Sequence, residues 1–377
     1  MTQFELDTLK GRIALKLSGL KVTAFYKRVE EGPVVTTLYY TLSDDVPINK
    51  IIGKEEDIAV SCGVESVLIT RKAGEIAIAI PNKVREVVAF DKCLYHMLTQ
   101  DQEKKLPIML GVDTYGNPAS IDLVAQPHIL VAGSTGGGKS VLLGSIIGGL
   151  VCSKPPEEMR LILVDTKQLD LPLFKDLPHV TDNIETTQQF HDSFNKLMSI
   201  VRKRTEKMKG VARNVTEYNE LNLGPRLPYY VVIIDELGDL IDEDSALAKA
   251  KTEPYCNYPR ITARIKSLVQ ICRAAGVHII CATQRSSVKV ISGDIKANMP
   301  TRIALRLPSR ADSTTILNTG GAQHLLGRGD MLLESATTAN AVRYHGAFVS
   351  NKDIANILQN AKQIREELKR LRIVRSA

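Results

Sequence analysis

The sequence predicts an α/β protein with a mostly parallel sheet, preceded by a small α+β domain. From about residue 106 onward, short apolar runs alternate with helical segments, which is typical of parallel strands buried on both faces and covered by helices. Before that point, β-rich runs are separated by Gly, Pro and Asn. We therefore expect a small domain over residues 1–105, an α/β domain over 106–350 and a C-terminal helix over 351–377.

The composition is that of a globular protein. Of the 377 residues, 44% are hydrophobic and 24% are charged, and no apolar run is long enough to cross a bilayer. The N-terminus has no signal pattern, so we expect a cytoplasmic protein whose six scattered cysteines are reduced. The net charge of +7 permits a nucleic-acid partner, whereas the absence of Trp argues against a single-strand binder that stacks bases.

The N-terminal part is expected to contain two helices and three strands. The helices are Leu9–Val29 and Ile51–Cys62, and the strands are Val34–Tyr40, Ser66–Thr70 and Glu75–Ile80. A charged stretch at 101–105, followed by a proline, is the predicted boundary.

Five apolar runs in the larger part predict the strands of its sheet. Helices are expected between them over 192–209 and 263–275, and another over 352–371 at the C-terminus. The strands are Ile129–Ala132, Leu161–Val164, Val231–Ile234, His278–Ala282 and Thr301–Leu305.

A phosphate-binding loop follows the first of these strands and precedes an apolar helix. Its residues are Gly133, Ser134, Thr135, Gly136, Gly137, Gly138, Lys139 and Ser140. The glycines let backbone N–H groups converge on anionic oxygens, and the helix that begins there adds its dipole. Lys139 can reach the β- and γ-phosphates, and the Ser140 hydroxyl can join the Mg²⁺ shell. The loop therefore predicts a nucleotide site with Mg²⁺.

A second nucleotide motif is the acidic pair Asp235 and Glu236, which follows the apolar strand at 231–234. We assign Asp235 to the water shell of Mg²⁺ and Glu236 to the general base that polarises an attacking water. The alternative is a solvated acidic turn. An adjacent Asp-Glu pair favours a hydrolase over a P-loop kinase.

Gln284 follows the strand at 278–282, at the sheet edge where a γ-phosphate would lie. It is the candidate γ-phosphate sensor. The alternative is a polar loop residue that only satisfies local hydrogen bonds.

Further stretches extend this pattern, and through them the chain resembles the motor of the FtsK/SpoIIIE double-stranded DNA translocases. Upstream residues resemble that family's α domain, and downstream residues resemble the end of its RecA-like β domain. The stretches are Gly32–Thr36, Ile80–Glu86, His128–Ser140, Asp165–Lys167, Pro178–Asp182, Arg213–Asn214, Tyr218–Glu220, Cys272–His278, Ala282–Arg285, Ile295–Ile303, Gly327–Met331 and His345–Ser350.

The chain also departs from the family's pattern. Thr166 and Ser286 stand where the family usually has proline, and residues 243–259 form a longer connection than usual. Nothing resembles the family's membrane anchor, and no winged-helix γ domain follows Ala377, so membrane attachment and sequence-directed loading are not expected. A loading or anchoring partner, or a role for a plasmid or phage, is expected instead.

The resemblance implies a RecA-like P-loop ATPase that assembles as a hexameric ring around double-stranded DNA, with ATP between subunits. A neighbouring subunit would then supply a cation to the transition state, and Arg302 and then Arg273 are the candidates. A salt bridge or a snorkelling side chain is the alternative for each. The candidate DNA contacts, each of which is as readily a solvated lysine, are Lys249, Lys251, Lys289 and Lys296.

Three other functions stay open. A conjugative or phage DNA pump would act on single strands, although the low aromatic content favours the duplex. A secretion-type ATPase would move polypeptide, but such proteins usually carry tandem motors and membrane segments. A nucleotide-gated binding module without turnover would not require the complete set of Lys139, Ser140, Asp235 and Glu236.

Overall fold

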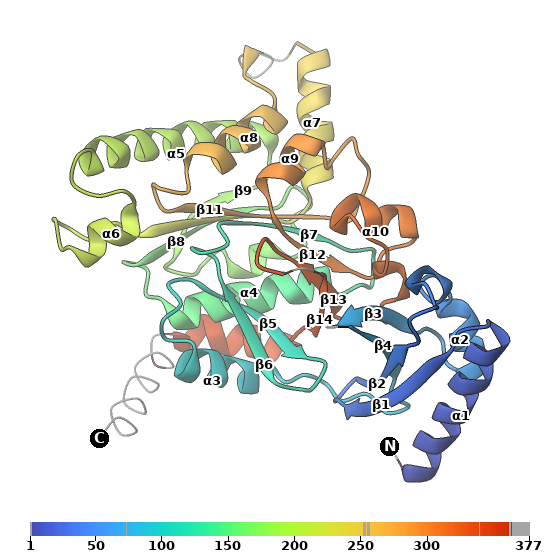
Figure 1. The fold of residues 1–377 in the computed structure, drawn as a ribbon. Helices are drawn as coiled ribbons and strands as arrows, with labels where there is room; N and C mark the ends of the chain where they lie inside the picture. Colours follow the sequence, from blue (N-terminus) through green and yellow to red (C-terminus); the bar gives the residue numbers. More distant parts are fainter. Residues whose placement is uncertain are drawn as a thin grey trace, which may run out of the picture.

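The computed structural model describes residues 2–72, 74–251, 254, 257–338, 340–361 and 363. It consists of a small N-terminal α+β unit and a larger α/β unit, which lie side by side (Figure 1). None of the helices in these ranges combines the length and apolar composition that a bilayer crossing requires.

The small unit is a four-stranded antiparallel sheet packed against two helices. Its strand order is β1-β2-β4-β3, and its core contains buried Ile13, Leu38, Ile58 and Ile78. The elements are α1 (Gln3–Gly19), β1 (Ala24–Glu31), β2 (Val35–Leu42), η1 (Ile48–Lys50), α2 (Glu55–Cys62), β3 (Leu68–Lys72) and β4 (Glu75–Pro81).

Two helix boundaries in this unit were predicted incorrectly. The first helix ends at Gly19, and residues 24–29 of the predicted helix belong to β1, because they pair with β2 along the edge of the sheet. The second helix begins at Glu55, where three acidic residues occupy its first turn, and not at Ile51.

The larger unit is built on a ten-stranded mixed sheet of order β6-β5-β14-β13-β12-β7-β11-β10-β8-β9. The strands from β12 to β9 in this order are parallel, and the pairs from β12 back to β6 are antiparallel. The strands are β5 (Pro107–Asp113), β6 (Pro118–Asp122), β7 (His128–Ala132), β8 (Met159–Val164), β9 (Val180–Ile184), β10 (Tyr229–Ile234), β11 (Val277–Thr283), β12 (Thr301–Leu305), β13 (Asp330–Glu334) and β14 (Val342–His345).

Helices cover both faces of this sheet (Figure 1). Along β7, Ile129 and Val131 pack into the core that contains α3 and α4, whereas Leu130 and Ala132 pack into the core that contains α5, α7 and α8. The helices are α3 (Phe90–Gln100), α4 (Lys139–Ser153), η2 (Leu171–Phe174), α5 (Thr187–Met208), α6 (Val215–Glu220), α7 (Leu237–Lys249), α8 (Ile261–Ile271), α9 (Gly293–Asn298), α10 (Arg310–Leu317) and η4 (Ala322–His324). All five strands predicted in this part are present, and the predicted fold class is confirmed.

The packing of α3 bears on the domain boundary predicted at residue 105. Phe90, Met97 and Leu98 are buried in the core of the larger unit, together with residues of α4 and β5. We therefore propose that the boundary lies between Pro81 and Phe90. Residues 351–361 are helical, and Ile357 is buried in the same core, while most of the C-terminal helix predicted over 351–377 lies outside the described residues.

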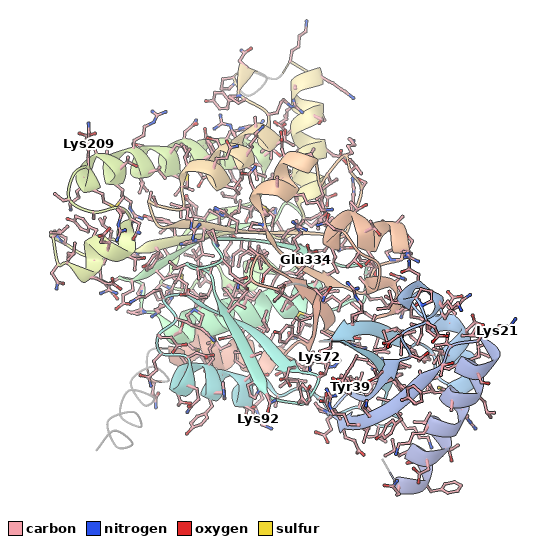
Figure 2. The ribbon with its side chains drawn as sticks, in the orientation of Figure 1. Lys21, Tyr39, Lys72, Lys92, Lys209 and Glu334 are labelled. Carbon is pink, nitrogen blue, oxygen red and sulfur yellow. The ribbon has the colours of Figure 1, made fainter. Side chains whose placement is uncertain are left out.

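Tyr39, Lys72 and Tyr115 join the two units. The Lys72 ammonium donates to the Tyr115 hydroxyl (2.5 Å) and lies 4.8 Å from the centre of the Tyr115 ring. Tyr39 and Lys72 lie together on the sheet of the small unit (Figure 2). Tyr115 belongs to the turn between β5 and β6, so this cation–π contact fixes that turn against the small unit.

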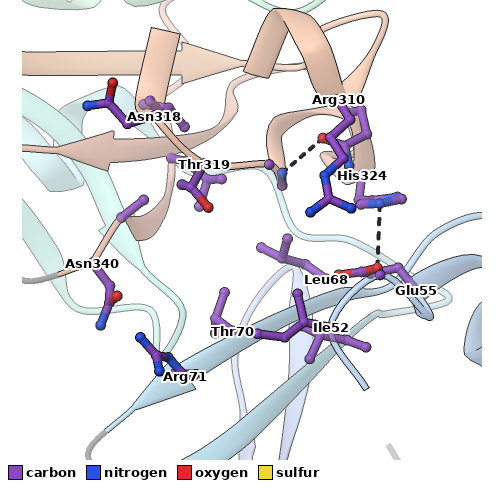
Figure 3. A pocket seen from close by; sticks show the side chains of 18 of the residues that line it. Ile52, Glu55, Leu68, Thr70, Arg71, Arg310, Asn318, Thr319, His324 and Asn340 are labelled. Atoms are coloured by element: carbon purple, nitrogen blue, oxygen red, sulfur yellow. Dashed lines mark hydrogen bonds and ion pairs between the residues drawn. The ribbon is translucent and has the colours of Figure 1, made fainter. Parts of the chain in front are cut away.

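A cavity of about 810 Å³ separates the units on the side of α2 and α10 (Figure 3). Its walls include Leu68 from the small unit and Arg310 from the larger one. His324 also lines this cavity; it lies 3.9 Å from a Glu55 carboxylate oxygen, and its backbone carbonyl accepts from the Ser66 hydroxyl.

Candidate nucleotide-binding site

The P-loop connects β7 to α4 at the edge of the sheet where the parallel strands end. Gly136 and Gly138 have φ values of +78° and +104°, in the left-handed region that favours glycine. A Cβ on Gly138 would lie 2.5 Å from the backbone nitrogen of Gly329. The loop is therefore closely packed against the segment at 327–329, and only glycine fits at position 138.

Lys139 is buried and paired with Asp235. Its Nζ donates to Asp235 Oδ1 (2.5 Å) and to the Asp235 backbone carbonyl (2.7 Å). Burial raises the pKa of Asp235, an effect that Lys139 opposes and that Asp165 and Asp170 reinforce. The fold thus brings together two predicted residues that are 96 positions apart in the chain.

Ser140 donates its hydroxyl hydrogen bond to Asp170, a residue that the sequence analysis did not single out. Asp170 lies in the loop after β8, which is held by Asp165: the carboxylate of Asp165 accepts five backbone N–H groups from residues 167–171. Mg²⁺ takes oxygen ligands and keeps most of its water, and the Ser140 hydroxyl and the Asp235 carboxylate supply oxygens of that kind. The predicted metal residues Ser140 and Asp235 are therefore compatible with that ion.

Glu236 caps the N-terminus of α7, and the residue as a whole is 5% exposed. Oε1 accepts from the Thr283 hydroxyl (2.6 Å) and the Gly238 N–H (3.2 Å), and Oε2 accepts from the Gln284 N–H (2.8 Å). Both carboxylate oxygens are therefore engaged by the end of β11 and by the first turn of α7. These three donors fill most of the roughly four acceptor sites of the carboxylate, so within this buried site a water can reach Glu236 only at Oε2.

Gln284 lies next to the P-loop, as predicted. Its side-chain oxygen accepts from the Thr135 hydroxyl (3.0 Å), and its backbone N–H is the donor to Glu236. One residue therefore contacts both the phosphate-binding loop and the candidate base.

A cavity of about 670 Å³ opens over the P-loop. Lys139 and Gln284 line it, and so do Val87 and Phe348, which are 73% and 51% exposed. Arg328, an exposed residue in the left-handed region, lines it as well. The lining therefore includes both polar groups suited to phosphates and apolar side chains suited to a base.

Asp330 forms a buried charged network beneath this cavity. It accepts from Arg343 Nε (2.9 Å) and Nη2 (2.6 Å), from the Leu326 N–H (2.8 Å), and lies 3.2 Å from His345 Nδ1. Burial acts to raise the pKa of Asp330, but Arg343 and His345 outweigh it and hold the pKa well below its usual range. The network fixes the 326–329 segment, whose Gly329 N–H donates to the P-loop carbonyl of residue 137 (2.8 Å).

The two candidate trans-acting arginines have different surroundings. Arg302, in β12, is 9% exposed and donates to Glu334 Oε1 (3.2 Å) and to the Met299 carbonyl (3.2 Å). It would have to leave Glu334, which lines the cavity between the units, in order to reach a neighbouring subunit. Arg273 is exposed just before β11, at the sheet edge opposite the P-loop.

The four candidate DNA-contacting lysines do not form one cluster. Lys249 ends α7, and Lys251 follows it in an exposed turn. Lys289 is exposed in the loop after β11 and pairs with Asp242 of α7 (3.0 Å). Lys296 donates to the Thr314 carbonyl (3.2 Å), and burial lowers its pKa, so it is the least suited of the four to a phosphate contact.

Two departures from the family pattern are partly explained. Ser286 is buried and its hydroxyl donates to Asp312 Oδ1 (2.5 Å), so a hydrogen bond anchors the turn where the family usually has proline. The long connection at 243–259 begins as the last turns of α7, and residues 252, 253, 255 and 256 lie outside the described part of the chain.

Over most of its length, the chain is similar in sequence to proteins of the FtsK/SpoIIIE family. A profile described as the FtsK/SpoIIIE family matches residues 92–288, and one described as the FtsK alpha domain matches residues 1–82. The DNA translocase FtsK of Helicobacter pylori is 32% identical over 372 residues, which cover 96% of this chain and 42% of that protein. The DNA translocase FtsK of Staphylococcus aureus is 33% identical over 356 residues, which cover 91% and 43%. The chain thus spans less than half the length of these relatives.

Solved structures agree in fold. The pCW3 conjugation coupling protein TcpA, in its monomer form with ATPγS, gives a TM-score of 0.63 at 23% identity and covers 93% of this chain and 99% of that one. The cytoplasmic domain of the Thermomonospora curvata type VII secretion ATPase EccC gives 0.56 at 24% identity and covers 69% and 31%. Both similarities concern the fold.

Proposed function

Because the chain belongs to the FtsK/SpoIIIE family, we propose that it is an ATP-driven motor that moves double-stranded DNA. The observation that carries this proposal is the joint placement of Lys139, Asp235, Glu236 and Gln284 at one edge of the sheet. A module that only binds nucleotide would not need the Glu236 carboxylate, nor a residue such as Gln284 that contacts both Glu236 and the P-loop. The relatives named DNA translocase support DNA as the moved polymer.

In the proposed reaction, the P-loop backbone and Lys139 hold the phosphates of ATP. A bound Mg²⁺ would be held by Ser140 and Asp235 and would neutralise charge on the phosphates. The Glu236 carboxylate orients the attacking water and takes its proton, and Gln284 contacts the γ-phosphate. For this, Lys139 exchanges its contact with Asp235 for the phosphates, and Glu236 Oε2, which has one protein donor, accepts a second hydrogen bond from the water.

We further propose a homo-hexameric ring with ATP at the subunit interfaces. The support is that neither candidate arginine lies at the phosphate edge of its own subunit: Arg273 precedes β11 at the opposite edge, and Arg302 is the second residue of β12. A cation from the neighbour would complete the transition-state charge stabilisation. Because Arg273 is exposed and Arg302 is paired, Arg273 reaches a neighbour with less rearrangement.

DNA would be bound through its phosphates with little base discrimination. The support is the net charge of +7 and the exposed cations Lys249, Lys251 and Lys289 on α7 and the loop after β11. A cytoplasmic location and a separate loading or anchoring protein belong to the same proposal.

The test is ATP hydrolysis with and without linear duplex DNA. We expect stimulation that falls steeply as salt rises and that Lys139→Ala abolishes. Equal turnover with and without any DNA would contradict the proposal. Stronger stimulation by single-stranded than by double-stranded polymer would favour the conjugative type of pump, and electron micrographs with duplex DNA would test the six-fold ring directly.

A further inference from the structure

A set of ion pairs lies between the candidate base and the exposed loop after β11. Arg285 directly follows Gln284, and its guanidinium pairs with Asp242 and with Asp239 Oδ1 (2.9 Å) of α7. Lys289, four residues further on, donates to Asp242 Oδ1 (3.0 Å). Two cations of one loop therefore converge on the first turns of one helix.

The same helix begins at Glu236. The end of β11 is thus bound to the start of α7 twice: by Thr283 and Gln284 at the Glu236 carboxylate, and by Arg285 at the two aspartates. Gly238 lies between these two contacts, and a Cβ at that position would be 3.0 Å from Arg285 Cδ and 3.1 Å from Glu236 Oε1. The Arg285 and Glu236 side chains therefore both pack against Gly238, so a displacement of Arg285 changes the packing beside Glu236.

The outer contacts are accessible, unlike the inner ones. The side chains of Arg285, Asp242 and Lys289 are 50%, 40% and 74% exposed, whereas Glu236 and Thr283 are buried. Exposed ion pairs are weak and are screened by salt, so a polyanion can compete for their cations. A guanidinium beside an ammonium is well suited to adjacent phosphodiester groups, because arginine binds phosphate oxygens in a bidentate manner.

We propose that Arg285 and Lys289 form a binding site for the DNA backbone, and that Asp242 and Asp239 occupy this site until phosphodiester groups displace them. Transfer of Arg285 to DNA loosens the contact of Gln284 and Thr283 with Glu236 and frees the carboxylate for water. DNA would thus stimulate hydrolysis by releasing the base. This inference rests on the proposed function and adds the residues that couple its two activities.

The main test compares Asp242→Asn with the wild type in the absence of DNA. We expect the variant to hydrolyse ATP roughly threefold to tenfold faster, as the loss of two exposed ion pairs allows, and to be stimulated correspondingly less by duplex DNA. Glu206→Gln is the matched control, because it removes one exposed carboxylate from α5 with the same change in net charge. Its basal and stimulated rates should equal those of the wild type.

Salt gives a second, independent readout. Without DNA, added NaCl should raise wild-type turnover by screening the ion pairs, and should have little effect on Asp242→Asn. A merely structural role for Asp242 would not produce this difference. Arg285→Gln should likewise raise the basal rate and flatten the salt dependence of DNA binding, because it removes both the ion pair and a phosphate contact.

The outcomes separate the two proposals. Unchanged basal turnover in Asp242→Asn, with normal DNA stimulation of the wild type, would overturn the coupling while leaving the motor intact. Absence of DNA stimulation in the wild type would overturn the motor. A melting temperature of Asp242→Asn equal to that of the wild type confirms that the comparison is between folded proteins.

Discussion

Replacing Arg343 by methionine tests the buried network under the nucleotide cavity. Arg343 is 6% exposed and supplies two of the hydrogen bonds to Asp330, which is 2% exposed. Methionine has a similar length and no charge, so the substitution leaves Asp330 with only the Leu326 N–H and His345 as partners. An ionised carboxylate left buried without its cation costs about 3–5 kcal/mol, a large part of the roughly 5–15 kcal/mol that stabilises a typical domain.

The assay is urea unfolding followed by circular dichroism at pH 7 and at lower pH. Arg343→Met should lose about 3–5 kcal/mol at pH 7, and the deficit should shrink as the pH falls, because Asp330 can then take up a proton. The nucleotide should also bind more weakly, since Asp330 fixes the segment whose Gly329 N–H contacts the P-loop.

Two controls accompany this variant. Lys209→Met removes an exposed cation at the end of α5 (Figure 2) and should be nearly neutral. Adding Asp330→Asn to Arg343→Met should recover part of the loss, because the buried charge is gone. A loss below about 1 kcal/mol for Arg343→Met would refute the reasoning, since that is near the roughly 0.5 kcal/mol typical of surface substitutions.

Three further predictions concern catalysis and pH. Glu236→Gln should lower the rate of ATP hydrolysis by roughly 10²–10⁴-fold and leave ATP binding intact. Steady-state hydrolysis measures the first and equilibrium nucleotide binding the second. An unchanged rate would mean that another residue is the base. Thr135→Val should lower turnover by about threefold to tenfold, since one neutral hydrogen bond to Gln284 is lost, and an effect only on nucleotide affinity would argue against the sensor role. Burial lowers the pKa of His128 to about 3 and that of His278 to about 4. The unfolded chain therefore binds more protons than the folded chain below about pH 6.5, and the free energy of unfolding falls from there toward pH 4. Each histidine should contribute a loss of roughly 2 kcal/mol between pH 7 and 5, and His128→Phe should flatten the dependence of the urea midpoint on pH.

The sequence alone determined the features whose chemistry is local. The strand, the glycine-rich loop and the helix of the P-loop are contiguous, so the spacing of Gly133, Lys139 and Ser140 is itself the site. The acidic pair at 235–236 was found for the same reason, because it directly follows an apolar strand. The parallel sheet was predicted from apolar runs buried on both faces.

The ends of helices and strands, and the boundary between the two units, were less determined by the sequence. The strand at 24–31 and the packing of α3 with the larger unit depend on which element each segment contacts. Local composition carries little of that information.

Tertiary structure decided the partners of the charged residues. The partner of Ser140 is Asp170, that of Arg302 is Glu334, and those of Arg285 are two aspartates of α7. Each pair joins residues that are distant in the chain, and the order of the strands in the sheet brings them together. A charged residue in a sequence has many possible partners, and only the fold selects one. The sequence therefore identified the candidate residues of the nucleotide site, whereas the structure decided which contacts hold them in place.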